Sequence, residues 1–182
     1  TPITRTIKTE KPIEAKPDAS KGKRTLTELF GTNYEIYRYP SELGEPVAAA
    51  ARRDLGNGKK TFRQATWLPD DEVWVQKGKG SEVPLFNAPA LAADKASGPL
   101  AADYVLVVEG ERCAQACAEL GFLCTTSIGG SNAAHKSDWS LLEDVHVVII
   151  PDCDDPGSKY AQNVVQLCTE AGAASVKIVD LD

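Results

Sequence analysis

The chain reads Val107-Val108-Glu109-Gly110-Glu111 and, some forty residues later, Ile149-Ile150-Pro151-Asp152-Cys153-Asp154-Asp155-Pro156-Gly157. Each stretch continues a short apolar run, at 104–108 and 145–150, that is typical of a buried parallel strand. In an open α/β sheet, ligands bind at the carboxyl ends of such strands. Carboxylates gathered there repel one another unless they share a hard cation such as Mg²⁺. The two stretches therefore indicate phosphate chemistry at one edge of a parallel sheet.

The region around these stretches predicts strands that alternate with helices. We expect strands at 104–108, 123–126, 145–150 and 175–181, and helices at 112–120, 138–142 and 158–171. Such alternation is typical of a parallel sheet with right-handed crossovers.

Residues 34–93 have a different pattern, in which strand-like runs are separated by turn signals. We expect antiparallel strands at 34–39, 47–53, 60–68 and 72–76, and the segment 84–89 leads out of this unit. The predicted fold class is therefore α/β: a Rossmann-like parallel four-stranded sheet with helices, preceded by a small antiparallel β-rich subdomain.

The sequence divides into three predicted parts: a flexible basic linker at 1–24, the β-rich subdomain at 25–103 and the α/β domain at 104–182. The net charge is uneven, because residues 1–103 hold 16 basic and 14 acidic side chains (+2) and residues 104–182 hold 4 and 12 (−8). A slightly basic part beside an acidic, metal-suited part fits a nucleic-acid enzyme.

Composition argues against several classes of protein. The sequence has no apolar stretch of membrane-spanning length and no signal-peptide pattern, so we expect a soluble, intracellular protein. Five cysteines without a CxxC pair favour reduced thiols over a zinc site or disulfides. The absence of methionine and the start at Thr1 predict a piece of a longer protein.

The Asp152-Cys153-Asp154 stretch has two interpretations. If the chain stays extended, both carboxylates point the same way and can bind Mg²⁺. Alternatively, this is an acidic loop at a helix start, where Asp155 or Ser158 caps free backbone N–H groups. Glu109 is likewise either a metal ligand or general base, or a surface residue favoured by the helix dipole.

Basic side chains gather around one predicted turn and are the candidates for contact with nucleic acid: Arg52, Arg53, Lys59, Lys60 and Arg63. Cations beside aromatic rings suit single strands, through phosphate contact and base stacking. Phe62 and Trp67 are close by, although both fit equally well in the core of a hairpin.

A second candidate binding site for phosphate is Gly129-Gly130-Ser131-Asn132, whose backbone N–H groups can cradle an oxyanion. Lys136 is near enough in sequence to contact a nucleoside triphosphate. A plain loop of small residues is the simpler interpretation of this segment.

Together, the acidic motifs resemble the Toprim domain, which bacterial-type primases share with type IA and type II topoisomerases. The resemblance covers 104–182, from the strand that ends in Glu-Gly to the strand that ends in Asp-x-Asp and the helix after it. It implies that Glu109 has an acid/base or metal role. It also implies that Asp152 and Asp154 bind Mg²⁺, with Mn²⁺ as an alternative.

The β-rich part resembles the region before Toprim in phage and plasmid (DnaG-like) primases, including primase–helicase fusions. The stretches that carry this resemblance are Lys60-Thr61-Phe62-Arg63-Gln64, Pro84-Leu85-Phe86-Asn87-Ala88-Pro89, Glu109-Gly110-Glu111-Arg112-Cys113-Ala114 and Thr125-Thr126-Ser127-Ile128-Gly129-Gly130. One departure is Cys113, which stands where many DnaG-type primases have a further Asp. The number of metal ions is therefore left open.

The resemblance implies the catalytic core of a DNA primase, a nucleotidyltransferase that makes short RNA primers on a single-stranded DNA template. Its implied partners are ribonucleoside triphosphates and a fused or associated replicative helicase, with no membrane, in the cytoplasm of a bacterial or phage-infected cell. The alternatives are a Toprim nuclease or topoisomerase subunit, and a non-catalytic nucleic-acid-binding module attached to a helicase.

Overall fold

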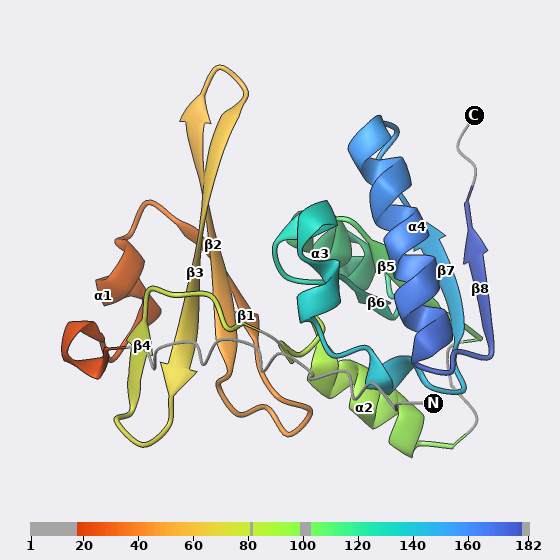
Figure 1. Cartoon of the computed structure of the whole chain (residues 1–182), viewed down its shortest axis with the longest axis horizontal. Helices are drawn as coiled ribbons and strands as arrows, with labels where there is room; N and C mark the ends of the chain where they lie inside the picture. Colours follow the sequence, from red (N-terminus) through yellow and green to blue (C-terminus); the bar gives the residue numbers. More distant parts are fainter. Residues whose placement is uncertain (1–17, 81, 99–102, 180–182) are drawn as a thin grey trace, which may run out of the picture.

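The computed structural model describes residues 18–80, 82–98 and 103–179, and it contains one antiparallel and one parallel four-stranded sheet (Figure 1). The first sheet and its helices are η1 (Ala19–Lys21), α1 (Leu26–Phe30), β1 (Glu35–Tyr39), β2 (Ala48–Gly56), β3 (Lys59–Leu68) and β4 (Val73–Val75). There follow α2 (Ala88–Ala96), β5 (Val105–Val108), α3 (Glu111–Glu119), β6 (Cys124–Thr125), η2 (Gly130–Asn132), η3 (Ala134–Lys136), η4 (Ser140–Leu142), β7 (His146–Ile150), α4 (Asp155–Glu170) and β8 (Ser175–Ile178). The predicted fold class is confirmed.

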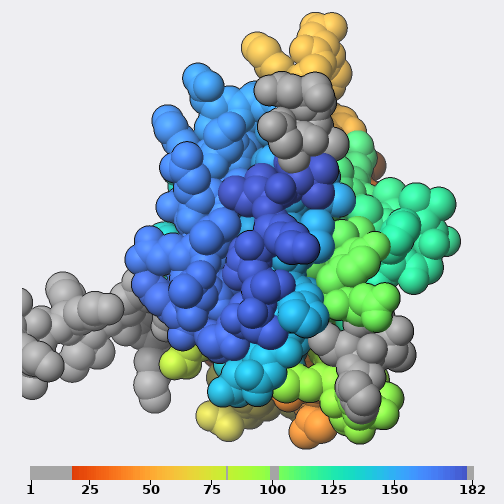
Figure 2. All heavy atoms as spheres, turned by 90° about the vertical axis from the view of Figure 1, so that its right-hand side faces the viewer, coloured from red at the N-terminus to blue at the C-terminus, as the bar shows by residue number. Residues whose placement is uncertain are grey.

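The parallel sheet has the strand order β6-β5-β7-β8, so the two strands that precede the acidic stretches are neighbours at its centre. Val108 pairs with Ile150, which brings the residues after β5 and β7 to the same edge. Side chains from α4, including Tyr160 and Val164, pack against the buried residues of β7. Figure 2 shows α4 and β8 side by side on the face that points away from the antiparallel sheet.

The antiparallel sheet has the strand order β1-β2-β3-β4, and away from the β2–β3 turn it is buried on both faces. We call the parallel sheet, with the helices that pack on it, the parallel unit. The face that carries Tyr39 and Ala50 is the inner face, because these residues pack against Leu106 and Val108 of the parallel unit. The outer face carries Ala49 and packs against α1. In Figure 1, α1 and the parallel unit accordingly lie on opposite sides of this sheet.

Helix α2 is absent from the sequence-based prediction, which treated 84–89 as an exit segment. Asn87 takes a left-handed conformation (φ 61°) and begins the helix, with a proline in its first turn. The segment before it is fixed by tertiary contacts: the Phe86 amide donates to the Thr126 carbonyl (3.0 Å), and the Thr125 hydroxyl donates to the Phe86 carbonyl (2.6 Å). The helix therefore depends on docking against the parallel unit, which local periodicity does not reveal.

Other differences are smaller. The helix expected at 138–142 is a single 3₁₀ turn, η4, and α4 begins at Asp155 instead of residue 158.

Of the predicted linker, residues 1–17 lie outside the described residues. Lys23, by contrast, pairs with Trp74 through two backbone hydrogen bonds of 2.7 and 2.8 Å. Among the described residues, no helix combines the length and apolar character needed to cross a membrane.

Candidate active site

A cavity of about 580 Å³ lies between the inner face of the antiparallel sheet and the carboxyl end of the parallel sheet. One wall comes from β2 and β3 and the other from the residues after β5, β6 and β7. The residues that line it are Ala50, Arg52, Lys60, Phe62, Arg63, Gln64, Glu109, Gly110, Glu111, Arg112, Cys113, Gly129, Gly130, Ser131 and Asp152. The cavity thus brings together members of all three sets of residues that the sequence suggested.

Glu109 directly follows β5 and is half-buried at the cavity wall, where its Oε2 atom is buried without a hydrogen-bond partner in the described part of the chain. Burial raises the pKa of its carboxyl group, the charges of Asp152 and Asp154 raise it further, and Lys60 opposes the shift. A buried carboxylate oxygen without a partner is costly. A bound cation would remove that cost, so Glu109 fits the role of a Mg²⁺ ligand.

Asp154 has a different local role from Asp152. Its Oδ1 atom accepts a hydrogen bond of 2.7 Å from the Gly157 amide, which makes Asp154 the N-cap of α4. The capping interpretation of this loop is therefore right, but the residue that caps the helix is Asp154 and not Asp155 or Ser158. The chain turns at this point because the Asp154 amide also donates to the Asp152 carbonyl (2.8 Å).

Because of this turn, Asp152 and Asp154 border different cavities. Asp152 lines the cavity described above, which we call the main cavity because it holds members of all three sets of candidate residues. Asp152 also lines a second cavity of about 600 Å³, and of these two cavities Asp154 lines only the second. Within residues 18–80, 82–98 and 103–179, no three or more His, Cys, Asp or Glu side chains form a group suited to hold a metal ion by themselves. Mg²⁺ commonly takes one or two carboxylates and completes its shell with water and substrate phosphates. Glu109 and Asp152 fit that smaller ligand set, and the metal role of Asp154 stays a prediction.

Tyr160 supports the floor of this site, and sequence reasoning missed it. It is fully buried, and its hydroxyl donates to the Val108 carbonyl at 3.1 Å. The same oxygen lies 3.4 Å from the Thr126 hydroxyl and 3.3 Å from the Ser127 hydroxyl. Tyr160 therefore ties α4 to the ends of β5 and β6, through the residue that precedes Glu109.

The predicted basic cluster is divided between two faces of the sheet. Because successive side chains of a strand alternate, Arg52 and Lys60 share the inner face, whereas Arg53, Lys59 and Arg63 share the outer one. Arg63 borders the cavity, but its guanidinium lies over the ring of Tyr34 on the outer face. One sequence cluster has thus become two surfaces.

The two aromatic candidates are also separated. Phe62 is 51% exposed and lines the cavity, with the Arg52 guanidinium carbon 6.0 Å and the Lys60 ammonium 5.8 Å from its ring centre. Trp67 instead packs against Trp74, with 5.3 Å between ring centroids. The hydrophobic-core interpretation is therefore right for Trp67 and wrong for Phe62.

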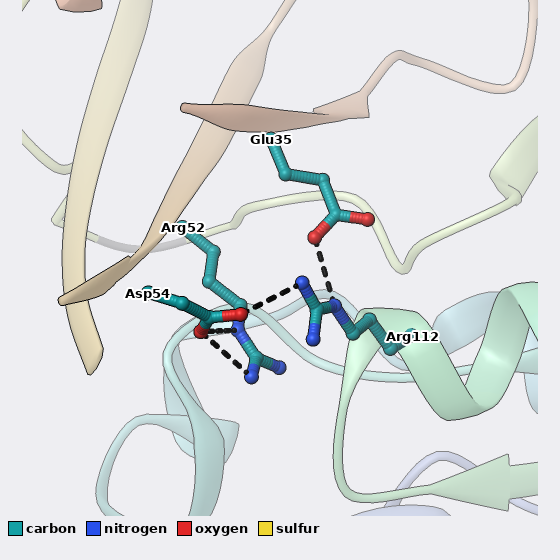
Figure 3. A network of polar contacts seen from close by, with 4 residues as sticks. All are labelled: Glu35, Arg52, Asp54 and Arg112. Carbon is teal, nitrogen blue, oxygen red and sulfur yellow. Dashed lines mark hydrogen bonds and ion pairs between the residues drawn. The ribbon is translucent and has the colours of Figure 1, made fainter. Parts of the chain in front are cut away.

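A charged network joins the two walls of the cavity (Figure 3). Arg112 of α3 pairs with Glu35 (2.8 Å) and with Asp54 (3.1 Å), and Asp54 also pairs with Arg52 (3.0 Å). Hydrogen bonding from Arg52 is the main cause that lowers the pKa of Asp54. The two pairs of Arg112 join residues 77 and 58 positions apart, so no local pattern could have found them.

The chain is similar to a solved structure of the zinc-binding and RNA polymerase domains of the Aquifex aeolicus primase, with a TM-score of 0.55 and 18% sequence identity. The match covers 80% of this chain and 33% of that one. No protein-family model and no curated protein matches the sequence. The chain has a primase-like fold.

Within this primase-like fold, the glycine pair belongs to the cavity and Lys136 does not. Gly129 and Gly130 have φ values of 81° and 66°, which favour glycine, and both line the cavity. Lys136 is not one of the described residues that line the cavity. The Lys136 carbonyl accepts a hydrogen bond from the Val83 amide at 2.9 Å. Cys113 also lines the cavity, so the departure from the DnaG-type pattern falls inside the site.

Proposed function

We propose that this chain is the catalytic core of a DNA primase that joins ribonucleotides into short primers on single-stranded DNA with Mg²⁺. One observation carries the proposal: Glu109 and Asp152 line the same cavity as Arg52 and Lys60, and the buried Glu109 oxygen has no hydrogen-bond partner among the described residues. Phosphoryl transfer needs carboxylates for metal ions and fixed cations for phosphate charge. The primase-like fold supports the same reaction class, and the chain spans about a third of the similar structure's length.

Each wall of the cavity has its own task in this proposal. Glu109 and Asp152 would hold Mg²⁺, which when bound stabilises negative charge on the departing pyrophosphate. Arg52 and Lys60 would bind the triphosphate of the incoming ribonucleotide, and Phe62 between them offers a face for base stacking. Gly129 and Gly130 let the backbone approach the phosphates closely. The Toprim identity of 104–182, a phage or plasmid origin and a helicase partner belong to the same proposal.

The test is primer synthesis by the 182-residue chain with labelled ribonucleotides, Mg²⁺ and a single-stranded template. We expect short RNA products, which Glu109→Gln and Asp152→Asn each reduce about 100-fold or more while template binding stays intact. Glu119→Gln, which changes an exposed carboxylate at the far end of α3, is the matched control.

Three results would overturn the proposal. Full activity in either variant would remove the carboxylates from the mechanism. Cleaved DNA that depends on the same carboxylates, without RNA products, would identify a nuclease. Tight binding without any Mg²⁺-dependent product would identify a binding module.

A further inference from the structure

The outer face of the β2–β3 hairpin carries a group of cations around one aromatic ring. The guanidinium carbons of Arg53 and Arg63 lie 5.9 and 5.2 Å from the centre of the Tyr34 ring. Lys59 is on the same face of β3, about 13 Å from Arg63 along the strand. We call these four residues the outer basic patch.

The charges of the outer basic patch differ from those of the inner face in their ion pairing. Within the part of the chain that the structure describes, Arg53, Lys59 and Arg63 form no ion pair, whereas Arg52 on the inner face pairs with Asp54 at 3.0 Å. Two guanidinium groups beside one ring repel each other unless an anion lies between them. This surface therefore has charge available for a ligand, in contrast to the inner network.

The ring at the centre of the patch is held in place for contact. Tyr34 is partly buried, and its ring lies 6.0 Å from that of Phe30 in α1. The guanidinium groups of Arg53 and Arg63 lie over this ring, so the ring supports a surface made of two planar cations. Such a surface suits single-stranded nucleic acid, because a base stacks on a guanidinium plane and the phosphates meet its charge. Duplex bases, already stacked on one another, do not offer a free face for this contact.

The position of the patch fits a strand that passes over the hairpin. The main cavity, at about 580 Å³, has the size of a small-ligand site, so most of a bound strand must contact other surfaces. Figure 1 places the hairpin tip and the carboxyl ends of the parallel strands at the same end of the molecule. In Figure 2 the tip, in yellow-orange, projects beyond the parallel unit.

We propose that Tyr34, Arg53, Lys59 and Arg63 bind single-stranded nucleic acid on the outer face of the hairpin, with Arg63 at the edge that borders the cavity. The binding itself is independent of catalysis; that the strand is the template for primer synthesis rests on the proposed function. In this arrangement the inner residues Arg52 and Lys60 bind the nucleotide, and the outer basic patch binds the nucleic-acid strand.

The test is the affinity of the chain for a labelled single-stranded oligodeoxythymidine, measured by fluorescence anisotropy in EDTA without nucleotides and over a series of salt concentrations. Arg53→Gln/Arg63→Gln should weaken binding about tenfold or more at 0.1 M salt and reduce the slope of log K against log salt by about 1.4. Tyr34→Leu should weaken binding with little change in that slope, because stacking releases few counterions. The matched control is Lys95→Gln/Lys177→Gln, which removes the same charge from the parallel unit.

An unchanged affinity and slope in the arginine variant would overturn the proposal, as would an equal loss in the lysine control. A wild type that binds duplex as tightly as single strand would overturn the single-strand assignment. If the double variant does not fold, Arg63→Gln alone tests the same point through a slope change of about 0.7. Failure of the proposed function is distinguishable, because wild type would then bind the oligonucleotide through the patch and make no primer.

Discussion

Gly157 lies against the backbone of Asp152, with no room for a side chain between them. A Cβ atom on Gly157 would collide with the Asp152 carbonyl oxygen and lie 2.9 Å from the carbonyl carbon and the amide nitrogen. The Gly157 amide meanwhile donates to Asp154. The first turn of α4 therefore determines how the loop that carries Asp152 leaves β7.

Gly157→Ala should consequently lower stability by about 1–3 kcal/mol and reduce turnover, because the loop must move to admit the methyl group. Helix propensity alone predicts the opposite, a gain of roughly 1 kcal/mol for alanine inside a helix. Chemical denaturation measures the sign. Gly110→Ala adds the same methyl group where no atom lies within 4 Å, so it serves as the control for stability. A more stable Gly157→Ala variant would show that the close contact does not constrain the loop.

Tyr160→Phe should cost about 1–2 kcal/mol, because the buried Val108 carbonyl loses its donor and the hydroxyls of Thr126 and Ser127 lose a partner. It should also lower the rate of primer synthesis more than it raises the Michaelis constant, since Tyr160 acts on the position of Glu109 and not on the substrate. Tyr104→Phe, at a partly exposed tyrosine before β5, removes a hydroxyl for comparison. Equal effects of the two variants would argue against the positioning role.

Arg112→Gln should loosen the attachment of the two cavity walls in a salt-dependent manner. The Arg112 side chain is 48% exposed, so its pairs with Glu35 and Asp54 are screened by salt. We expect a small decrease in melting temperature at low ionic strength that disappears at high ionic strength. Glu35→Gln should behave alike, and the double variant should lose less than the sum of the two. A decrease that is independent of salt would assign Arg112 a packing role instead.

The strands and the central carboxylates could be predicted from sequence because their signals are local. The apolar runs before Glu109 and Asp152 fix two neighbouring parallel strands, and the turns fix the antiparallel sheet. Helix α1 also has a local signal in the sequence, the capping box of Thr25 and Glu28. Such patterns depend on residues a few positions apart, so one sequence is enough to find them.

The parts that could not be predicted depend on contacts between distant segments. Tyr160 is one apolar residue of an amphipathic helix until the fold brings Val108 to its hydroxyl, 52 positions away. The division of the basic cluster follows from which face of β2 and β3 packs on the parallel unit, a tertiary choice. Asp154 became a helix cap because Pro156 was accommodated inside the first turn of α4, where the missing N–H costs nothing.

Glu109→Gln should stabilise the folded chain at neutral pH in the absence of Mg²⁺. Burial, with the nearby charges of Asp152 and Asp154, raises the pKa of Glu109 above its value in the unfolded chain. The folded state then binds more protons than the unfolded state between the two pKa values, so wild-type stability decreases as pH rises through that window. Below the unfolded pKa of about 4.5, the penalty is absent and the variant should lose its advantage.

Thermal unfolding of the wild type and the Glu109→Gln variant across pH, in EDTA and in Mg²⁺, measures this difference in stability. Mg²⁺ should narrow the gap at neutral pH, because a cation beside Glu109 compensates the ionised carboxylate of the wild type and finds no such charge in the variant. Glu119→Gln, at an exposed position of α3, should show neither effect. A Glu109→Gln variant that is less stable than wild type at neutral pH in EDTA would mean that the buried oxygen already has a partner. The case for a cation at Glu109 would then fail.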